Sequence, residues 1–240
     1  MLRYLLEAPF SKKESIDRLF KDFGDVFDMF FIPSAPLGGP LLDSLAVSVY
    51  AKVSFNIDTI FSIRVRDVNL NHIIETVKTA EEFDIYGVAL TGGDPPVYGK
   101  ICGEVRSEEV LECLRNRMSR VRKGLIISLR FPLQAIYERV MKKPEFIIII
   151  NFNPYSEESY TKLKNTVKEA SIHGVEAYTY LLLGVGRSKH VFNEIKQPYI
   201  TEKDIPNIII KLEETNSNII LSSPRELDKA ATIMKTFRRR

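Results

Sequence analysis

Hydrophobic residues along the chain follow two alternating patterns. Short, mostly apolar runs such as 146–150 have the length and β-branched content of strands that are covered on both faces. Between these runs, apolar residues recur every three or four positions, which is the spacing of an amphipathic helix. The predicted strands are 4–6, 27–32, 59–65, 86–90, 125–129, 146–150, 175–183 and 218–221, and a helix is predicted after each of them, including 41–50 and 133–141.

Polar residues of the kind that cap helices precede or open several of the predicted helices. A side-chain oxygen at the cap position accepts a hydrogen bond from a backbone N–H of the first turn. In some of these helices an acidic residue three positions on adds the second half of a capping box. The predicted caps are Ser11, Asn69, Ser107, Ser156, Thr201 and Ser223.

Strand and helix alternate through the whole chain, which predicts a single (β/α)8 barrel domain spanning residues 1–240. The rival is an open, doubly wound sheet. Such a sheet usually has fewer strands and often carries a glycine-rich phosphate loop at its first turn. Here the first turn is 7–10, Glu-Ala-Pro-Phe, without a glycine, and we favour the closed barrel.

Composition limits the kind of protein. The chain has 240 residues, 45% of them hydrophobic, and can bury a sizeable core. A net charge of +3 gives no reason to expect nucleic acid, and no apolar run approaches the roughly 20 residues of a membrane span. Three scattered histidines and two cysteines at no metal spacing predict no metal site. Glu7 follows the start too soon for a signal peptide, so we expect a cytoplasmic protein, as a monomer or an oligomer.

Polar residues follow the predicted strands at the end where barrel enzymes carry their active sites. Acids, arginines and amides would there form a polar mouth above an apolar barrel, which suits an anionic, planar, hydrogen-bonding ligand. These residues are Glu7, Ser34, Arg64, Arg66, Asp67, Thr91, Asp94, Arg130, Asn151, Asn153, Arg187, Ser222 and Arg225.

Glu7 lies between apolar neighbours at the end of the first strand. Poor hydration raises the pKa of a carboxyl group and favours a role as proton donor. The alternative is a structural ion pair with an arginine such as Arg64, and the sequence does not separate the two.

Three further positions have both a functional and a plain interpretation. Gly92 and Gly93 before Asp94 predict a rigid loop that fixes one negative charge, or an ordinary turn. The glycines of 184–187 with Arg187 could hold a phosphate, or form a flexible turn. The amide of Asn151 could bind the donor–acceptor edge of a heterocycle, or tie down its own loop.

Two segments resemble the methylenetetrahydrofolate reductase family. The first is 66–69, Arg-Asp-Val-Asn, and the second is 88–96, Val-Ala-Leu-Thr-Gly-Gly-Asp-Pro-Pro, with a helix between them as in that family. The resemblance implies a barrel that binds FAD and reduces a methylene-pterin to its methyl form by hydride transfer from the reduced flavin. The electron donor would be a reduced nicotinamide or a redox partner protein.

The resemblance also implies roles for single residues. Glu7 would be the acid that protonates the pterin, Asp94 would tune the flavin, and Asn151 and Arg187 would bind the substrate. The chain departs from the family pattern at some positions, such as Ser62 in place of a histidine and Phe131 in place of a tyrosine. Because of these departures, binding of FMN instead of FAD, or of no flavin at all, stays open. The implied cofactor-binding residues are Arg64, Arg66, Asp67, Thr91, Gly92, Gly93, Asp94 and Arg130.

Two other functions stay open beside the reductase. One is a pterin-binding or accessory subunit of a one-carbon enzyme complex that has lost its flavin and its redox chemistry. The other is a methyl-transferring pterin barrel, which would need a corrinoid or zinc partner.

Overall fold

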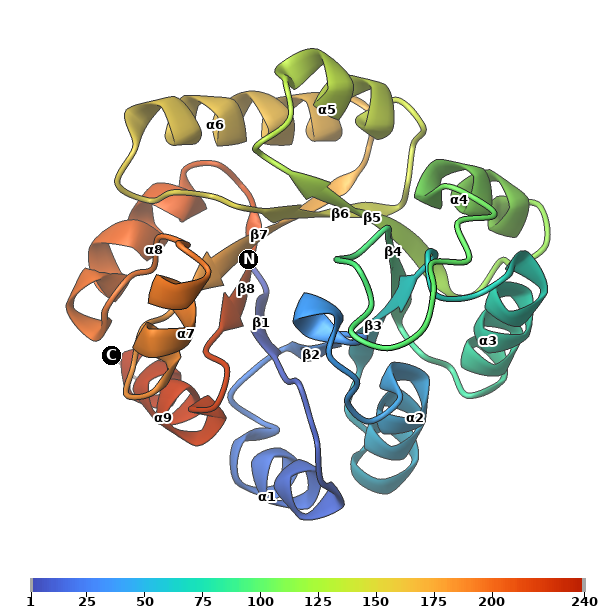
Figure 1. Ribbon diagram of the computed structural model, residues 1–240. Coiled ribbons are helices and arrows are strands. Elements are labelled where there is room, and N and C mark those ends of the chain that lie inside the picture. Colours follow the sequence, from blue (N-terminus) through green and yellow to red (C-terminus); the bar gives the residue numbers. More distant parts are fainter. Residues whose placement is uncertain (1, 239–240) are drawn as a thin grey trace.

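The computed structural model describes residues 2–238 and shows a closed barrel of eight parallel strands in sequence order, with helices outside (Figure 1). This confirms the predicted single (β/α)8, or TIM-barrel, fold. The strands are β1 (Tyr4–Glu7), β2 (Met29–Ile32), β3 (Thr59–Arg64), β4 (Gly87–Thr91), β5 (Arg122–Ser128), β6 (Phe146–Ile150), β7 (Glu176–Leu182) and β8 (Asn218–Ser222).

The helices alternate with these strands and form the outer layer. Two short 3-10 turns also occur: η1 (Pro36–Gly38) lies between β2 and α2, and η2 (Glu202–Asp204) lies between α7 and α8. The helices are α1 (Lys13–Phe23), α2 (Ser44–Phe55), α3 (Leu70–Glu82), α4 (Ser107–Arg115), α5 (Leu133–Val140), α6 (Glu157–Ile172), α7 (Ser188–Glu194), α8 (Ile205–Glu213) and α9 (Leu227–Arg238).

Strand side chains alternate between two cores. Leu6 faces the layer between strands and helices, whereas Leu5 packs inside the barrel with Phe146 and Tyr178. Because alternate residues of a strand share a face, Glu7 lies on the same interior face as Leu5, one step nearer the carboxyl end. Gly124 is required opposite Phe146, since a Cβ there would overlap the phenyl ring. The barrel interior is therefore a packed core that opens only toward its two ends.

Helix starts show which predicted caps were right. Asn69 and Ser156 accept backbone N–H bonds of the first turn, and Thr201 forms its capping box with Asp204. Ser11, Ser107 and Ser223 are not the caps: α1 follows Lys12, α4 follows Arg106, and α9 begins at Leu227. Ser223 is buried and bonded to Ser188 instead. The predicted helix 41–50 occupies 44–55, because Asp43 supplies the cap.

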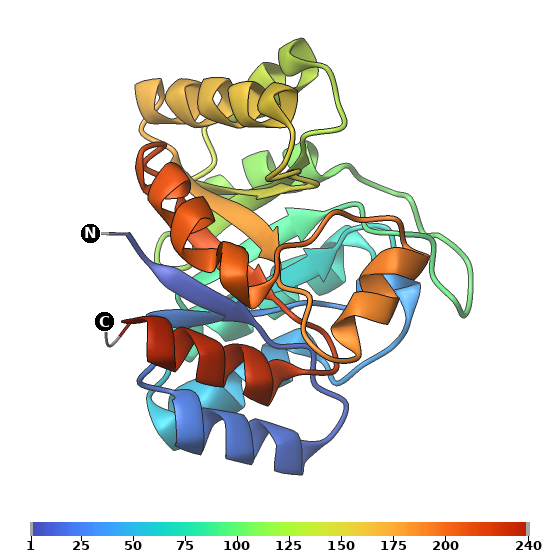
Figure 2. The same cartoon turned by 90° about the vertical axis from the view of Figure 1, so that its left-hand side faces the viewer.

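Long loops extend beyond the carboxyl ends of the strands (Figure 2). The stretch between β4 and α4, residues 92–106, has no helix or strand and projects farthest from the barrel. Together with η1 it overlies the ends of β2 to β4 (Figure 1). The opposite half of this face, above β5 to β8 and β1, holds Glu7 and Asn151.

Candidate active site

Glu7 is the buried acid of the carboxyl-end face. Its residue is only 7% exposed, and the Ser222 hydroxyl donates to its Oε2 at 2.5 Å. The Tyr180 hydroxyl, from β7, is a second hydrogen-bond partner. Burial raises the pKa of the Glu7 carboxyl, while the bonds from Ser222 and Tyr180 act in the opposite direction. Within residues 2–238 no Lys, Arg or His side chain forms an ion pair with Glu7. The proton-donor interpretation is therefore the one that the geometry favours.

Tyr180 shares this environment. Burial raises the pKa of its phenol well above the usual value, and the charge of Glu7 adds to the effect. The ring packs edge-on against Phe31, 6.5 Å between centroids. Sequence reasoning did not name Tyr180 as a site residue. The signal was present in the alternation of β7, where Tyr178 and Tyr180 occupy successive interior positions.

Arg64 does not pair with Glu7, so the structural alternative for Glu7 is wrong. Its side chain is 3% exposed, and its Nε donates to Asp67 at 2.7 Å. Its two terminal nitrogens reach the carbonyl oxygens of Ala35 and Asp94, each at 2.5 Å, and Asp67 again at 3.3 Å. Four of its five N–H groups are thus used within the protein. Arg64 joins the loops that follow β2, β3 and β4.

Further contacts make these three loops one unit, which we call the loop clamp (residues 33–43, 64–69 and 92–102). Val97 donates its backbone N–H to Gly38, and Arg66 donates to the carbonyl of Gly93. Gly93 has φ +70°, and a Cβ there would crowd the Arg64 side chain. The Asp94 residue is exposed, and only its carbonyl takes part in the clamp. The Gly-Gly-Asp-Pro-Pro segment therefore shapes a loop, as the plain interpretation expected.

The remaining predicted residues lie around this face. Thr91 accepts the N–H of Gly93, and Arg130 is exposed after β5. Asn151 follows β6 in a left-handed conformation, φ 62°, and its side chain bonds Ser128 and Gln197. Gln197, between α7 and η2, belongs to no motif and carries no signal in the sequence that could have identified it.

Arg187 and the glycine turn after β7 already hold a carboxylate. Glu226 Oε1 accepts the backbone N–H of Arg187 at 3.0 Å and its Nε at 3.1 Å, while Oε2 lies 2.9 Å from Lys229. The pKa of Glu226 is lowered to about 2, chiefly by the bond from Lys229 and then by that from Arg187. A Cβ on Gly186 would overlap Glu226. The groups that were considered for a phosphate are thus occupied by the protein's own anion.

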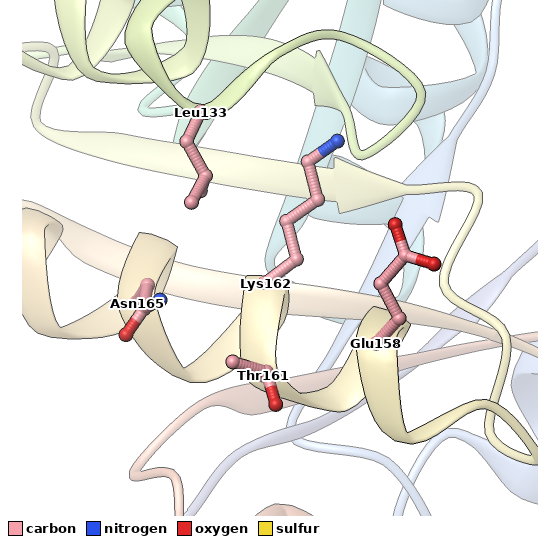
Figure 3. Close-up of a pocket in the computed structure, with 5 residues that line it drawn as sticks. All are labelled: Leu133, Glu158, Thr161, Lys162 and Asn165. Carbon is pink, nitrogen blue, oxygen red and sulfur yellow. The ribbon is translucent and has the colours of Figure 1, made fainter.

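Two surface cavities add to this picture. One, of about 180 Å³, lies within the loop clamp and is lined by Ala35, Gly38, Pro40, Asp67, Pro96, Tyr98 and Lys100. The other, of about 390 Å³, lies on the outer wall between α5 and α6, where Glu158 and Lys162 border it (Figure 3). The residues that line it belong to these two helices. It therefore lies in the outer helical layer, whereas Glu7 lies on the interior face of the barrel.

Two negative findings apply to residues 2–238 alone. No group of three or more His, Cys, Asp or Glu side chains is arranged to hold a metal ion. No helix in this part of the chain is long and apolar enough to cross a membrane.

Known proteins resemble this chain in fold. No protein-family model and no curated protein matches its sequence. Among solved structures, the putative copper homeostasis protein CutC of Streptococcus agalactiae aligns with a TM-score of 0.58 and 16% identity, covering 93% of this chain and 99% of that one. A chain of the tryptophan synthase a2b2 complex of Pyrococcus furiosus gives 0.60 and 10%, covering 100% and 97%. Deoxyribose phosphate aldolase of Aeropyrum pernix, a tetramer, gives 0.61 and 11%, covering 98% and 89%.

These findings correct the predicted family. The three structural neighbours are other barrels, and no family model supports membership of the methylenetetrahydrofolate reductases, so that assignment is wrong. The reason lies in the segment that carried the resemblance. Its glycines and prolines meet the needs of a tight loop against Arg64, and Gly, Pro and Asp serve turns in general, so they are weak evidence of a family.

Proposed function

We propose that this barrel is an enzyme that uses Glu7 as a general acid on a small molecule bound at the carboxyl ends of the strands. The observation that carries the proposal is a deeply buried carboxyl group that has hydroxyl partners and, within the part of the chain that the structure describes, no cationic partner. Such an arrangement lowers stability in the ionised state, and it is typical of catalytic acids in barrel mouths.

The surroundings of Glu7 suit both halves of a proton transfer. Burial favours the protonated form, which donates its proton to a basic oxygen, nitrogen or carbon of the substrate. The carboxylate that remains then accepts hydrogen bonds from Ser222 and Tyr180. These two hydroxyls hold the carboxyl group in one orientation and keep the cost of the ionised state moderate. Return of a proton from solvent would complete the cycle.

Reduction of a methylene-pterin by FAD or FMN, with a reduced nicotinamide or a redox protein as donor, stays a prediction. So does the flavin-free, pterin-binding subunit. The positions named for the flavin give little support to either flavin, because Arg64 is enclosed in the loop clamp and Arg66 bonds the Gly93 carbonyl. A flavin phosphate would have to displace those contacts. No step of the proposed mechanism depends on a flavin.

The experiment compares what the protein and its Glu7→Gln variant consume from a metabolite extract, followed by mass spectrometry. Glu14→Gln, on the exposed face of α1, is the matched control because it makes the same chemical change far from the barrel interior. We expect at least one small molecule to disappear with the unmodified protein and with Glu14→Gln, and to persist with Glu7→Gln. Consumption of the same molecule by all three proteins would refute the role of Glu7.

A further inference from the structure

The loop clamp presents a cluster of apolar side chains to solvent, which we call the clamp patch. Twelve large hydrophobic residues are exposed in the part of the chain that the structure describes, and five of them form this patch: Leu37, Leu42, Val97, Tyr98 and Ile101. Tyr98 is 76% exposed and Val97 60%, and both lie in the loop that projects farthest from the barrel (Figure 2). Single exposed apolar residues are normal in proteins, whereas a group of them on one projecting unit marks an interaction surface.

The backbone that carries the clamp patch is anchored. Val97 donates its N–H to the Gly38 carbonyl at 3.0 Å, and Cys102 donates its N–H to the Arg66 carbonyl at 2.7 Å. A Cβ on Gly38 would overlap the carbonyl oxygen of Pro95, so the turn after β2 and the loop after β4 are in direct contact. These contacts oppose a local movement that would withdraw the patch from water.

Part of the patch stands on strained backbone. Ala35 has φ 38° and Leu37 has φ 56°, both in the left-handed region, which is costly for residues with a Cβ. The turn leaves Leu37 57% exposed, so its side chain returns little stability to a single molecule. Strained residues of this kind concentrate at functional sites. Burial of Leu37 against a partner would supply the stabilisation that offsets the strain.

One acid and one base flank the most exposed residues of the patch. Asp94 lies before Val97, and Lys100 follows Tyr98 in the same loop. Both charged residues are exposed, and within residues 2–238 neither side chain forms an ion pair or a hydrogen bond. The segment 94–100 therefore has an acid at one end, an apolar centre and a base at the other end.

We propose that the clamp patch is the interface between two copies of this chain, related by a twofold axis perpendicular to the segment 94–100. Such an axis runs the two segments antiparallel, so that Asp94 of each copy lies opposite Lys100 of the other. Val97 and Tyr98 then meet at the centre and the two ion pairs lie at the rim, which is the usual arrangement of a protein interface.

Two features of the surface favour a second copy over an unrelated protein. The segment is complementary to itself in charge, because its one unpaired acid and its one unpaired base exchange places under the twofold rotation. The clamp cavity of about 180 Å³, which Tyr98 and Lys100 border, gives an apolar side chain of the other copy a recess to enter.

Analytical ultracentrifugation of the full chain over a range of concentrations tests the interface. We expect a monomer–dimer equilibrium with dimer evident by about 100 μM, and a dimer Kd that Tyr98→Ser raises at least about tenfold. Val97→Ser should also raise the Kd, whereas its matched control Val53→Ser, at a 68% exposed valine of α2, should leave it unchanged. A monomer throughout this range, or equal Kd values for the two valine variants, would overturn the proposal.

Exchange of the two charges tests the antiparallel arrangement. Lys100→Glu alone sets acid against acid, and Asp94→Lys alone sets base against base, so each variant should dimerise at least about tenfold more weakly. An equimolar mixture restores both ion pairs, and we expect its Kd to return to within about threefold of the unmodified value. Circular dichroism checks that both variants are folded. A mixture of folded variants that associates no better than either one alone would contradict the proposed pairing.

Discussion

Two acidic side chains at opposite ends of the barrel, Glu176 and Glu7, are held in opposite ways. At the amino end, Glu176 lies 2.6 Å from Arg122 and 3.5 Å from Arg3, and Asn218 donates to it at 2.7 Å. At the carboxyl end, Glu7 is more deeply buried, and its hydrogen-bond partners among residues 2–238 are the hydroxyl groups of Ser222 and Tyr180. Tyr86 extends the amino-end network by bonding both arginines.

Under the proposed function, this difference is the one expected between a structural acid and a catalytic one. A carboxylate enclosed by cations and amides closes the floor of the barrel and recovers much of its desolvation cost. A buried carboxyl group without a cation recovers little, so stability alone would not select it. The comparison teaches that burial alone does not distinguish the two roles, and that the presence or absence of a cationic partner is the feature on which the proposed role of Glu7 depends.

The largest effect is expected on turnover, when one residue at each end of the barrel is substituted and the two variants are compared. Glu7→Gln should lower the turnover of the substrate found in the extract by about a hundredfold or more, because general-acid catalysis typically contributes that much. Arg122→Met, at the other end, should leave turnover within about twofold and instead lower the free energy of unfolding by about 1–2 kcal/mol, since it removes one partner of a half-exposed pair. Steady-state rates and urea unfolding of both variants supply the test. A comparable loss of turnover in both would erase the distinction between the ends.

The next largest effect is expected on stability, in the loop clamp. There the Arg64 side chain is buried as deeply as Glu7, but it forms an ion pair with Asp67. Arg64→Met should lower the free energy of unfolding by about 3 kcal/mol, because it leaves Asp67 and two carbonyl oxygens without their partner. Hydrogen exchange should rise in 92–102 before it rises in the strands. Arg66→Met, whose one bond is to the Gly93 carbonyl at the surface, is the control and should cost less than about 1 kcal/mol. Equal costs would show that burial of Arg64 adds nothing.

The pH dependence of stability sharpens the comparison further. The pKa of Glu7 is raised in the folded protein, so the folded state binds its proton more tightly than the unfolded state does. The contribution of this group is full below the unfolded pKa, about 4.3, and is lost as pH rises through the folded pKa. Unfolding of the protein and of Glu7→Gln at a series of pH values should therefore show a difference that shifts in favour of Glu7→Gln as pH rises. A difference independent of pH would mean that the pKa of Glu7 is unshifted.

The smallest effect concerns Glu226, whose pKa is shifted in the other direction. Its lowered pKa, about 2, stabilises the protein above about pH 4.3, and this contribution is lost as pH falls toward 2. Glu226→Gln should cost about 1 kcal/mol at pH 7, because the Arg187 and Lys229 side chains that face it are largely exposed. The same urea series measures it. A cost that persists unchanged at pH 2 would show that the charge of Glu226 is irrelevant.

The fold was predictable from the sequence because the alternation of apolar runs and helical periodicity agreed with the barrel along the whole chain. Apolar runs such as 146–150 became strands, and Asn69 and Ser156 capped their helices as expected. Ser223 failed as a cap because two long-range hydrogen bonds, from Ser223 to Ser188 and from Arg187 to Glu226, decide the local structure there. Contacts of this kind leave no periodic pattern in the chain.

The site was predictable only in part, for the same reason. The apolar neighbours of Glu7 in sequence indicated its burial, and the strand order placed it in the barrel mouth. Its partners could not be read from the chain, since Ser222 and Tyr180 lie far away in sequence. The segment around Asp94 misled the family assignment because a turn motif is chosen by backbone geometry, and the same residues serve a loop as readily as a ligand; the role of Asp94 itself stays a prediction.

The most direct measurement of the central claim is the titration of Glu7 itself. In protein labelled with ¹³C at the glutamate carboxyl, the resonance absent from Glu7→Gln identifies this residue, and its chemical shift is followed against pH. We expect the carboxyl to titrate above the usual range of glutamates, because it is buried without a cation. Titration at or below that range would show that Glu7 is ionised as an ordinary carboxylate, and the proton-donor account would be contradicted.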